Sequence, residues 1–165
     1  MVRKDLSAKN NNWHVGLLET AFKAPADCLL ACFCAPCYSY YQRLVLTNHF
    51  TSNAYRCCNG AYGDCACHGD SCPELCLAGE VCFCFWCSVF GNRVTIQQRY
   101  DVKNTACEEC ILWSACILSW VIVIVRIFVN VPLSAEMLCD CIYMGLSGCM
   151  QSQQMAEIRY QSGGP

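Results

Sequence analysis

The spacing of apolar and polar residues along the chain predicts a mainly helical (mainly α) protein of about four helices. Residues 28–46 and 74–99 carry apolar side chains at roughly helical spacing, and both segments become polar near their C-terminal ends. Asp27 is placed to cap the first segment, and Pro36 is expected to kink or restart it. Residues 134–160 predict a last helix. Alternating runs typical of strands are scarce, so we expect no sheet of three or more strands.

The most apolar stretch begins with fifteen uncharged residues, 111–125. As a helix these would cover about 23 Å, whereas a bilayer core is about 30 Å thick. Extension to Leu133 gives about 34 Å and includes one charge, Arg126, whose long side chain can reach the interface. We expect one continuous helix over 111–131 that ends near Pro132. The pattern alone leaves open whether this helix spans a membrane, lies at its surface or is buried in a larger assembly.

The remaining segments give a simple domain organisation. Residues 1–27 form a polar lead-in, and residues 28–160 form one cysteine-rich domain in which 111–133 is a hydrophobic helical segment, read as an insertion. Residues 51–73 are rich in turn signals and predict an irregular loop rich in cysteine. Residues 161–165 are a flexible tail. No long internal repeat is apparent.

Composition and charge exclude two classes of protein. Hydrophobic residues make up 55% of the chain and charged residues 15%, which is too apolar for an intrinsically disordered protein. The net charge is -2, and no basic field exists to attract nucleic acid. We therefore expect partners among membranes or other protein subunits, including further copies of this chain, and no nucleic acid.

Cysteine is the informative residue, with 19 in 165 positions. A secreted disulfide scaffold is one explanation of such a number. However, the count is odd, and Met1–Trp13 contains no apolar region typical of a signal peptide. We therefore expect an intracellular protein, either membrane-associated or part of a cytoplasmic or cytoskeletal assembly. Its cysteines would bind metal, pack as small apolar side chains or carry lipid.

Three Cys-x-x-Cys pairs are the candidate metal ligands. Two residues between thiolates allow both sulfurs to bind one tetrahedral zinc ion, and two pairs complete a structural site. We predict a structural zinc site that uses two or more of Cys34, Cys37, Cys84, Cys87, Cys107 and Cys110. A second plausible cluster consists of Cys65, Cys67, His68, Cys72 and Cys76. The alternative is that the thiols are unliganded and pack as small apolar side chains.

The sequence offers little support for catalysis. A thioredoxin-like role for Cys34 and Cys37 would require a βαβ pattern around them, and none is present. No Ser/His/Asp order, phosphate loop or paired-carboxylate motif is recognisable. We therefore expect a protein that is not an enzyme.

The order of motifs resembles one known family. Cys32-Phe33-Cys34-Ala35-Pro36-Cys37, the polar helix end at 91–101 and the acidic Cys-x-x-Cys at 107–110 occur in the order found in the placenta-specific-eight family. That family is also called the onzin, cell-number-regulator or plant cadmium-resistance family. Its closing segment is matched at 148–158, so residues 111–138 resemble a hydrophobic insertion.

The resemblance implies a non-enzymatic intracellular or membrane-bound protein. Plant members of the family are linked to organ size and to the movement of cadmium, zinc or calcium. We therefore expect a cysteine-rich membrane-associated protein with a role in divalent-metal handling or growth regulation. The alternative is a structural or interaction subunit buried in a large protein assembly.

Overall fold

The computed structural model describes residues 11–47, 55–60, 68–69, 72–128 and 132–163, and these parts are predominantly helical. The mainly helical prediction is therefore confirmed, although the helices are more numerous and some are shorter than expected. In chain order the described helices are α1 (Thr20–Lys23), α2 (Pro25–Phe33), α3 (Ala35–Leu46), α4 (Pro73–Phe83), α5 (Phe85–Tyr100), α6 (Ala106–Phe128) and α7 (Leu133–Gln161).

The strands of the described parts are two residues long and form two separate pairs. β1 (Asn11–Asn12) runs parallel to β4 (Val102–Lys103), and β2 (Tyr55–Arg56) runs antiparallel to β3 (His68–Gly69). A short 3₁₀ turn, η2 (Cys57–Gly60), follows β2. The absence of a larger sheet from these residues agrees with the prediction. Most of the predicted 51–73 loop lies outside the described residues.

The first two long helices are separated by a sharp break. Cys34 has φ −132° and ψ 49°, which ends α2, and Pro36 then occupies the first turn of α3. Proline fits a first turn because the amide that it lacks would have no partner there. The predicted restart at Pro36 is confirmed. Asp27, in contrast, is not the cap, because α2 already begins at Pro25.

The prediction of one helix over 74–99 is wrong. Cys84 has φ −129° and ψ 47°, which are almost the same backbone angles as those of Cys34. The chain turns by 117° between α4 and α5. No proline causes this break. The Cys84 amide still donates to the Glu80 carbonyl and the Ser88 amide to the Cys84 carbonyl. The backbone bonds on both sides of Cys84 are therefore kept across the break, and α5 beyond it packs against α3 and α7.

The predicted apolar helix is confirmed as one continuous element, α6, through Phe128. A capping box fixes its start: the Thr105 amide donates to Glu108, and the Glu108 amide donates to the Thr105 hydroxyl. Residues 129–131, where the predicted helix ends, lie outside the described residues. The last helix is also confirmed, as α7.

The core is built around the C-terminal half of α7. Ala31 of α2, Ile96 of α5 and Met155 and Ile158 of α7 are buried in one cluster. Trp13 joins this cluster, and Leu17 is buried in a second one with Val89 and Met150. The sequence allows Trp13 and the Leu17–Leu18 pair of the polar lead-in to pack on the domain, and of these Trp13 and Leu17 are buried whereas Leu18 is exposed.

Two glycines permit close contacts between helices. A Cβ at position 148 would overlap the Cys32 Sγ and lie 3.2 Å from the Cys28 carbonyl oxygen, so Gly148 brings α7 directly onto α2. A Cβ at position 91 would lie 2.8 Å from the Cys58 carbonyl oxygen. Gly91 thus lets η2 pack on α5.

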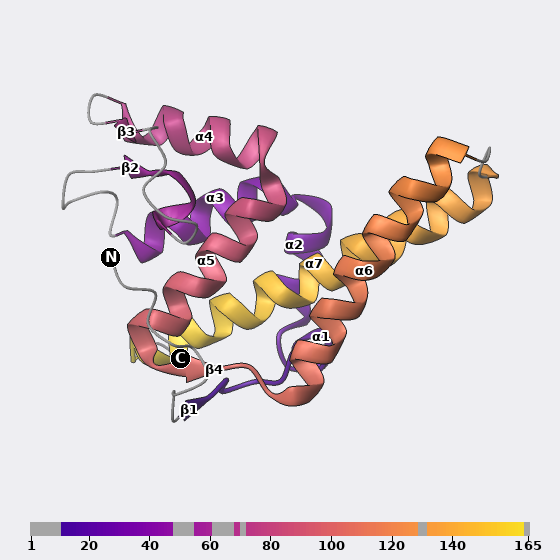
Figure 1. Cartoon of the computed structure of the whole chain (residues 1–165). Coiled ribbons are helices and arrows are strands. Elements are labelled where there is room, and N and C mark those ends of the chain that lie inside the picture. Colours follow the sequence, from indigo (N-terminus) through magenta and orange to yellow (C-terminus); the bar gives the residue numbers. More distant parts are fainter. Residues whose placement is uncertain (1–10, 48–54, 61–67, 70–71, 129–131, 164–165) are drawn as a thin grey trace.

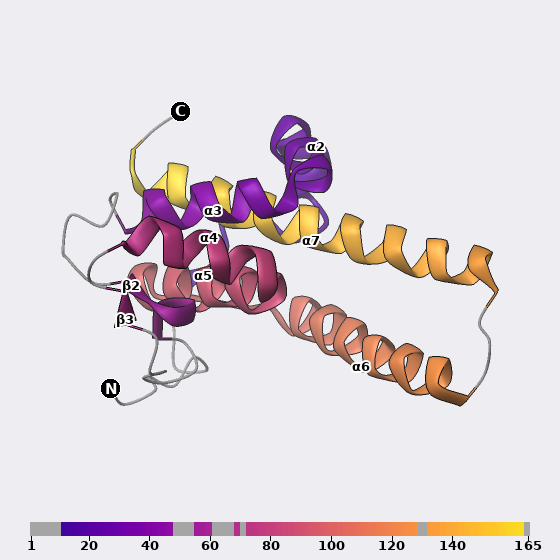
Figure 2. The same ribbon diagram turned by 90° about the horizontal axis from the view of Figure 1, so that it is seen from above.

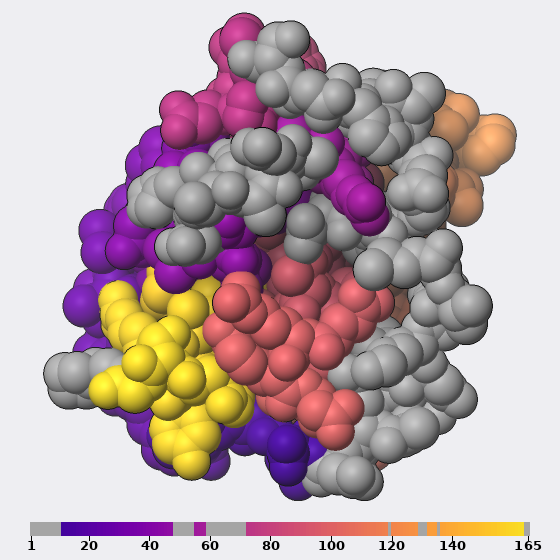
Figure 3. Space-filling view, turned by 90° about the vertical axis from the view of Figure 1, so that its left-hand side faces the viewer, coloured from indigo at the N-terminus to yellow at the C-terminus, as the bar shows by residue number. Residues whose placement is uncertain are grey.

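The molecule has two unlike ends. α6 and the first half of α7 project together from a compact body formed by the other helices (Figure 1 and Figure 2). We call this projection the α6–α7 hairpin. Figure 3 shows the opposite end, where the C-terminal part of α7 lies beside the end of α5.

Candidate membrane-facing surface and metal centre

The surface of α6 is apolar and largely exposed. The helix has 23 residues, its most apolar window has a mean hydropathy of 2.3, and none of that window is buried inside the protein. Its exposed large side chains include Trp113, Ile117, Trp120, Ile127 and Phe128. A soluble domain normally buries such a helix, so this exposed surface is a candidate contact for a membrane or a protein partner.

The partner helix α7 adds to the same surface. Leu133, Met137, Leu138, Ile142 and Met144 are exposed along its first half. The Tyr143 hydroxyl donates to the Ala115 carbonyl of α6 at 3.0 Å, and farther along the hairpin Arg126 pairs with Glu136 at 3.3 Å. The two helices are therefore linked near the body and near the tip, and both expose apolar side chains.

An apolar cavity of about 260 Å³ lies where the hairpin meets the body. Its walls come from α5, α6 and α7 and include Trp86, Phe90, Trp120 and Tyr143. Trp86 meets Tyr143 edge to face, with 6.0 Å between ring centroids. The start of α5 is thus in direct contact with the hairpin.

The two helix breaks extend the apolar surface onto the body. Phe33 at the end of α2 is 86% exposed and Phe83 at the end of α4 is 89% exposed. Leu29 and Leu30 on α2 are exposed as well. Both breaks, and the start of α6, lie at the end of the body from which the hairpin projects (Figure 1 and Figure 2). We call the breaks, the base of α6 and the hairpin the apolar end.

The breaks belong to an internal repeat that the sequence analysis missed. Residues 32–37 read Cys-Phe-Cys-x-x-Cys, and residues 82–87 repeat this motif fifty positions later. Arg43 and Arg93 follow at the same offset, each after an amide residue. The repeated residues occupy equivalent places on α2–α3 and α4–α5. The expectation of no internal repeat is therefore corrected.

Both repeated arginines are buried in the body. Arg43 donates to Glu80 at 3.1 Å and to Asn92, and burial lowers the pKa of its guanidinium. Arg93 donates to Gln153 at 2.8 Å and to Asn104 at 2.7 Å, and burial lowers its pKa to about 10. Each guanidinium donates its hydrogen bonds to acceptors of the protein itself. We therefore infer that both arginines stabilise the body.

Glu108 connects this core to the base of α6. Its carboxylate accepts hydrogen bonds from the Leu17 amide at 3.1 Å, the Thr105 amide at 3.0 Å and the Gln153 side chain at 2.5 Å. Arg93 lies 3.9 Å away. The first turn of α6 is therefore joined to the N-terminal segment and to α7.

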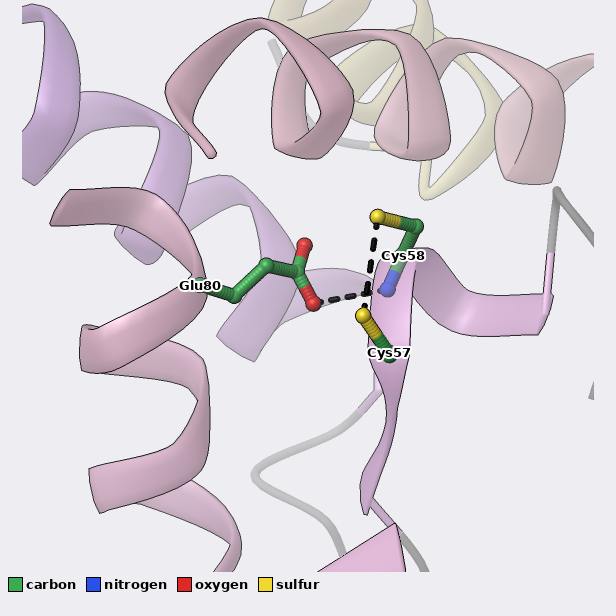
Figure 4. Close-up of side chains that lie close together, drawn as sticks. All are labelled: Cys57, Cys58 and Glu80. Atoms are coloured by element: carbon green, nitrogen blue, oxygen red, sulfur yellow. Dashed lines mark hydrogen bonds between the residues drawn. The ribbon is translucent and has the colours of Figure 1, made fainter. Parts of the chain in front are cut away.

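A possible metal-binding group lies inside the body, where α4 packs on η2. Cys57 and Cys58 of η2 and Glu80 of α4 bring their ligand atoms within 4.8 Å of one another, and the two sulfurs are 3.9 Å apart (Figure 4). Two sulfurs bound tetrahedrally at about 2.3 Å to one zinc ion lie about 3.8 Å apart. The donor set therefore fits a thiophilic divalent ion.

The same carboxylate already has protein partners. Glu80 Oε2 accepts hydrogen bonds from the Cys58 amide at 2.7 Å and the Tyr55 hydroxyl at 2.8 Å, while Oε1 faces Arg43. Burial, followed by the Glu80 charge, raises the pKa of the Cys58 thiol. Without an ion, these contacts keep Cys58 a neutral thiol and hold η2 against α4.

The predicted zinc ligands lie elsewhere. Cys34, Cys37, Cys84, Cys87, Cys107 and Cys110 are all exposed, at the two breaks and in the first turns of α6. None of them belongs to the group described above. The hydrogen bond that the Cys37 thiol makes to Cys34, with Cys82 nearby, raises the pKa of Cys37, and burial followed by Cys84 and Glu80 raises that of Cys87. Their zinc site stays a prediction.

Sequence reasoning did not identify Cys57, Cys58 and Glu80 as a group. Adjacent cysteines carry no spacing signal, and Glu80 reaches them only through the fold. Of the second predicted cluster, Cys65 and Cys67 lie outside the described residues, whereas Cys72 precedes α4 and Cys76 lies in its first turns.

Comparisons with protein-family models, curated proteins and solved structures found no match. The resemblance to the placenta-specific-eight family therefore rests on the motifs described above.

Proposed function

We propose that this protein is a non-enzymatic membrane protein that inserts its α6–α7 hairpin into a bilayer and holds its cysteine-rich body at the surface. The observation that carries the proposal is that no residue of the apolar window of α6 is fully buried within the protein. Exposed Leu133, Met137 and Ile142 on the facing helix extend this surface. Transfer of this surface from water into lipid is favourable in proportion to its area.

The dimensions of the hairpin suit a bilayer. The 23 residues of α6 span about 34 Å, of which the uncharged run 111–125 covers about 23 Å of a hydrocarbon layer of about 30 Å. Arg126 lies two residues before the end of α6 and pairs with Glu136, so this pair is placed near the far interface. The two helix breaks then lie at the near interface, with Phe33 and Phe83 toward lipid.

A subunit buried in a large assembly is the competing function, and membrane extraction separates the two. We expect the protein to remain in the membrane pellet after alkaline carbonate and high salt, and to be released by detergent. Release by carbonate in a large particle without lipid would support the assembly and contradict the hairpin.

A second candidate function is divalent-metal binding at Cys57, Cys58 and Glu80, which is favoured by the 3.9 Å sulfur separation. An ion there would take two thiolates and share Glu80 with Arg43. The guanidinium opposes a second cation at this carboxylate, so we place this function after membrane attachment.

Zinc or cadmium analysis of the reduced, purified protein tests this site. We expect about one ion per chain, lost when Cys57 and Cys58 are both replaced by Ser and kept in the matched Cys72→Ser variant. Loss on replacement of the Cys-x-x-Cys pairs would instead support the zinc site predicted from the sequence. Less than about 0.2 ion per wild-type chain would contradict both sites.

A further inference from the structure

We propose that Cys34, Cys37, Cys84 and Cys87, the thiols of the two helix breaks, are S-acylated with long-chain fatty acids. This inference rests on the proposed membrane attachment and adds a covalent one. It gives a use to cysteines that neither the core nor the possible metal-binding group employs.

The exposure of these thiols is the first observation. All four are exposed although cysteine is among the most buried residue types in proteins. The two copies of the repeat share this arrangement: Cys34 and Cys84 have nearly the same backbone angles, and the thiols around each break are exposed. A role in packing the core therefore does not explain the four side chains.

Their surroundings provide the second observation. Phe33 and Phe83, the most exposed aromatic residues near the breaks, immediately precede Cys34 and Cys84. The breaks lie at the apolar end, beside the base of the hairpin (Figure 2). Cysteines next to a membrane-inserted segment are sites of reversible S-palmitoylation. An acyl chain attached at either break would enter the same lipid leaflet as the phenylalanine side chains.

The chemistry needs one donor, a long-chain acyl-coenzyme A. The cysteine sulfur attacks the carbonyl carbon of the donor thioester, and a new carbon–sulfur bond forms as the bond to coenzyme A breaks. The leaving coenzyme A thiolate takes up the proton of the cysteine thiol. One thioester replaces another, so no oxidant or reductant is consumed.

Two acylated breaks would fix the orientation of the body. A single chain gives only marginal and reversible membrane binding, whereas two attachments give stable anchoring. The two breaks are neighbours, since Cys37 lies near Cys82, and the hairpin is a further attachment. Acyl chains at the breaks would therefore hold the body against the membrane on the face beside the hairpin.

The test is thiol exchange on the full-length protein isolated in membranes from cells. Free thiols are blocked, thioesters are cleaved with hydroxylamine, and the released thiols are labelled with a polyethylene-glycol maleimide. We expect hydroxylamine-dependent gel shifts in the wild type. These shifts should be lost when all four cysteines are replaced by Ser and unchanged in Cys72→Ser, an exposed thiol at the other end of α4.

The outcomes separate this inference from the proposed function. Retention of the wild type after carbonate extraction without hydroxylamine-dependent shifts would overturn acylation and leave the hairpin standing. Shifts that persist in the fourfold variant would place the lipid elsewhere and also overturn the inference. Zinc or a disulfide on these thiols in the membrane-bound protein would overturn it equally.

One further outcome concerns the hairpin. A labelled wild type found in the soluble fraction would support acylation and contradict membrane insertion. Because the four replaced side chains are exposed, the fourfold variant should keep the protease resistance of the wild-type body in detergent. That measurement shows that a lost shift does not result from unfolding.

Discussion

A charge at the middle of α6 is the sharpest test of the membrane-inserted hairpin. Ile117 lies eleven residues from both Ala106 and Phe128 and is 60% exposed. At 1.5 Å per residue it is about 16 Å from each end of the helix, which places it at the bilayer centre. Ile117→Lys therefore puts an ammonium group where solvation is poorest.

The expected magnitude follows from transfer energies. At the centre of a membrane helix lysine costs about 2.5–3.5 kcal/mol, whereas isoleucine contributes about 0.3–0.6 kcal/mol favourably, so the change costs about 3–4 kcal/mol. At a water-exposed site the same substitution would change stability by no more than about 0.5 kcal/mol. The membrane and aqueous environments thus predict equilibrium constants that differ by a factor of about 60 to 300.

Carbonate-resistant membrane association is the readout, with two controls. We expect Ile117→Lys to reduce the carbonate-resistant fraction strongly and Ile117→Leu to leave it unchanged. Gln98→Lys adds the same charge to an exposed position near the opposite end of the body and should have no effect. If Ile117→Lys stays in the pellet as completely as the wild type, α6 does not cross the bilayer centre.

Two further predictions concern stability in detergent. Gly148→Ala should lower the thermal unfolding midpoint because its Cβ would overlap Cys32, whereas Gly145→Ala on the same helix has open space and should raise stability by up to about 1 kcal/mol. Equal effects of the two substitutions would contradict the close contact of α7 with α2. Glu80→Gln should cost about 3–5 kcal/mol in chemical unfolding because it leaves the buried Arg43 charge without its anion, and the double variant Arg43→Met with Glu80→Met should recover most of that loss. Additive losses in the double variant would show that the two residues do not act as a pair.

The parts of the fold with local signals could be predicted from the sequence. The length and apolar character of α6 are local, as is the proline that restarts α3, and both predictions are confirmed. The break at Cys84 has no proline or glycine and became clear only through its likeness to Cys34. Trp13 and Leu17 stand out as apolar residues in a polar segment, and their packing on the domain could therefore be anticipated.

The candidate site was harder to predict because its parts are far apart in sequence. Glu80 approaches Cys57 and Cys58 only when α4 packs on η2, and no residue spacing encodes that contact. The Cys-x-x-Cys pairs were visible from the sequence, but spacing does not reveal exposure. A thiol that faces solvent beside lipid and a thiol that faces a metal have the same local sequence.

The attachment of α6 to the body has a mechanical consequence. Three hydrogen bonds to Glu108 hold its first turn, and they come from the N-terminal segment, the capping residue and α7. The first turn of α6 is therefore joined to the body at several points, and we expect the hairpin and the body to move together. Membrane helices tilt to match the thickness of the bilayer. If the hairpin spans a bilayer, the hairpin and the body would tilt together in a thinner membrane, so that the bilayer thickness sets the angle between the body and the membrane surface.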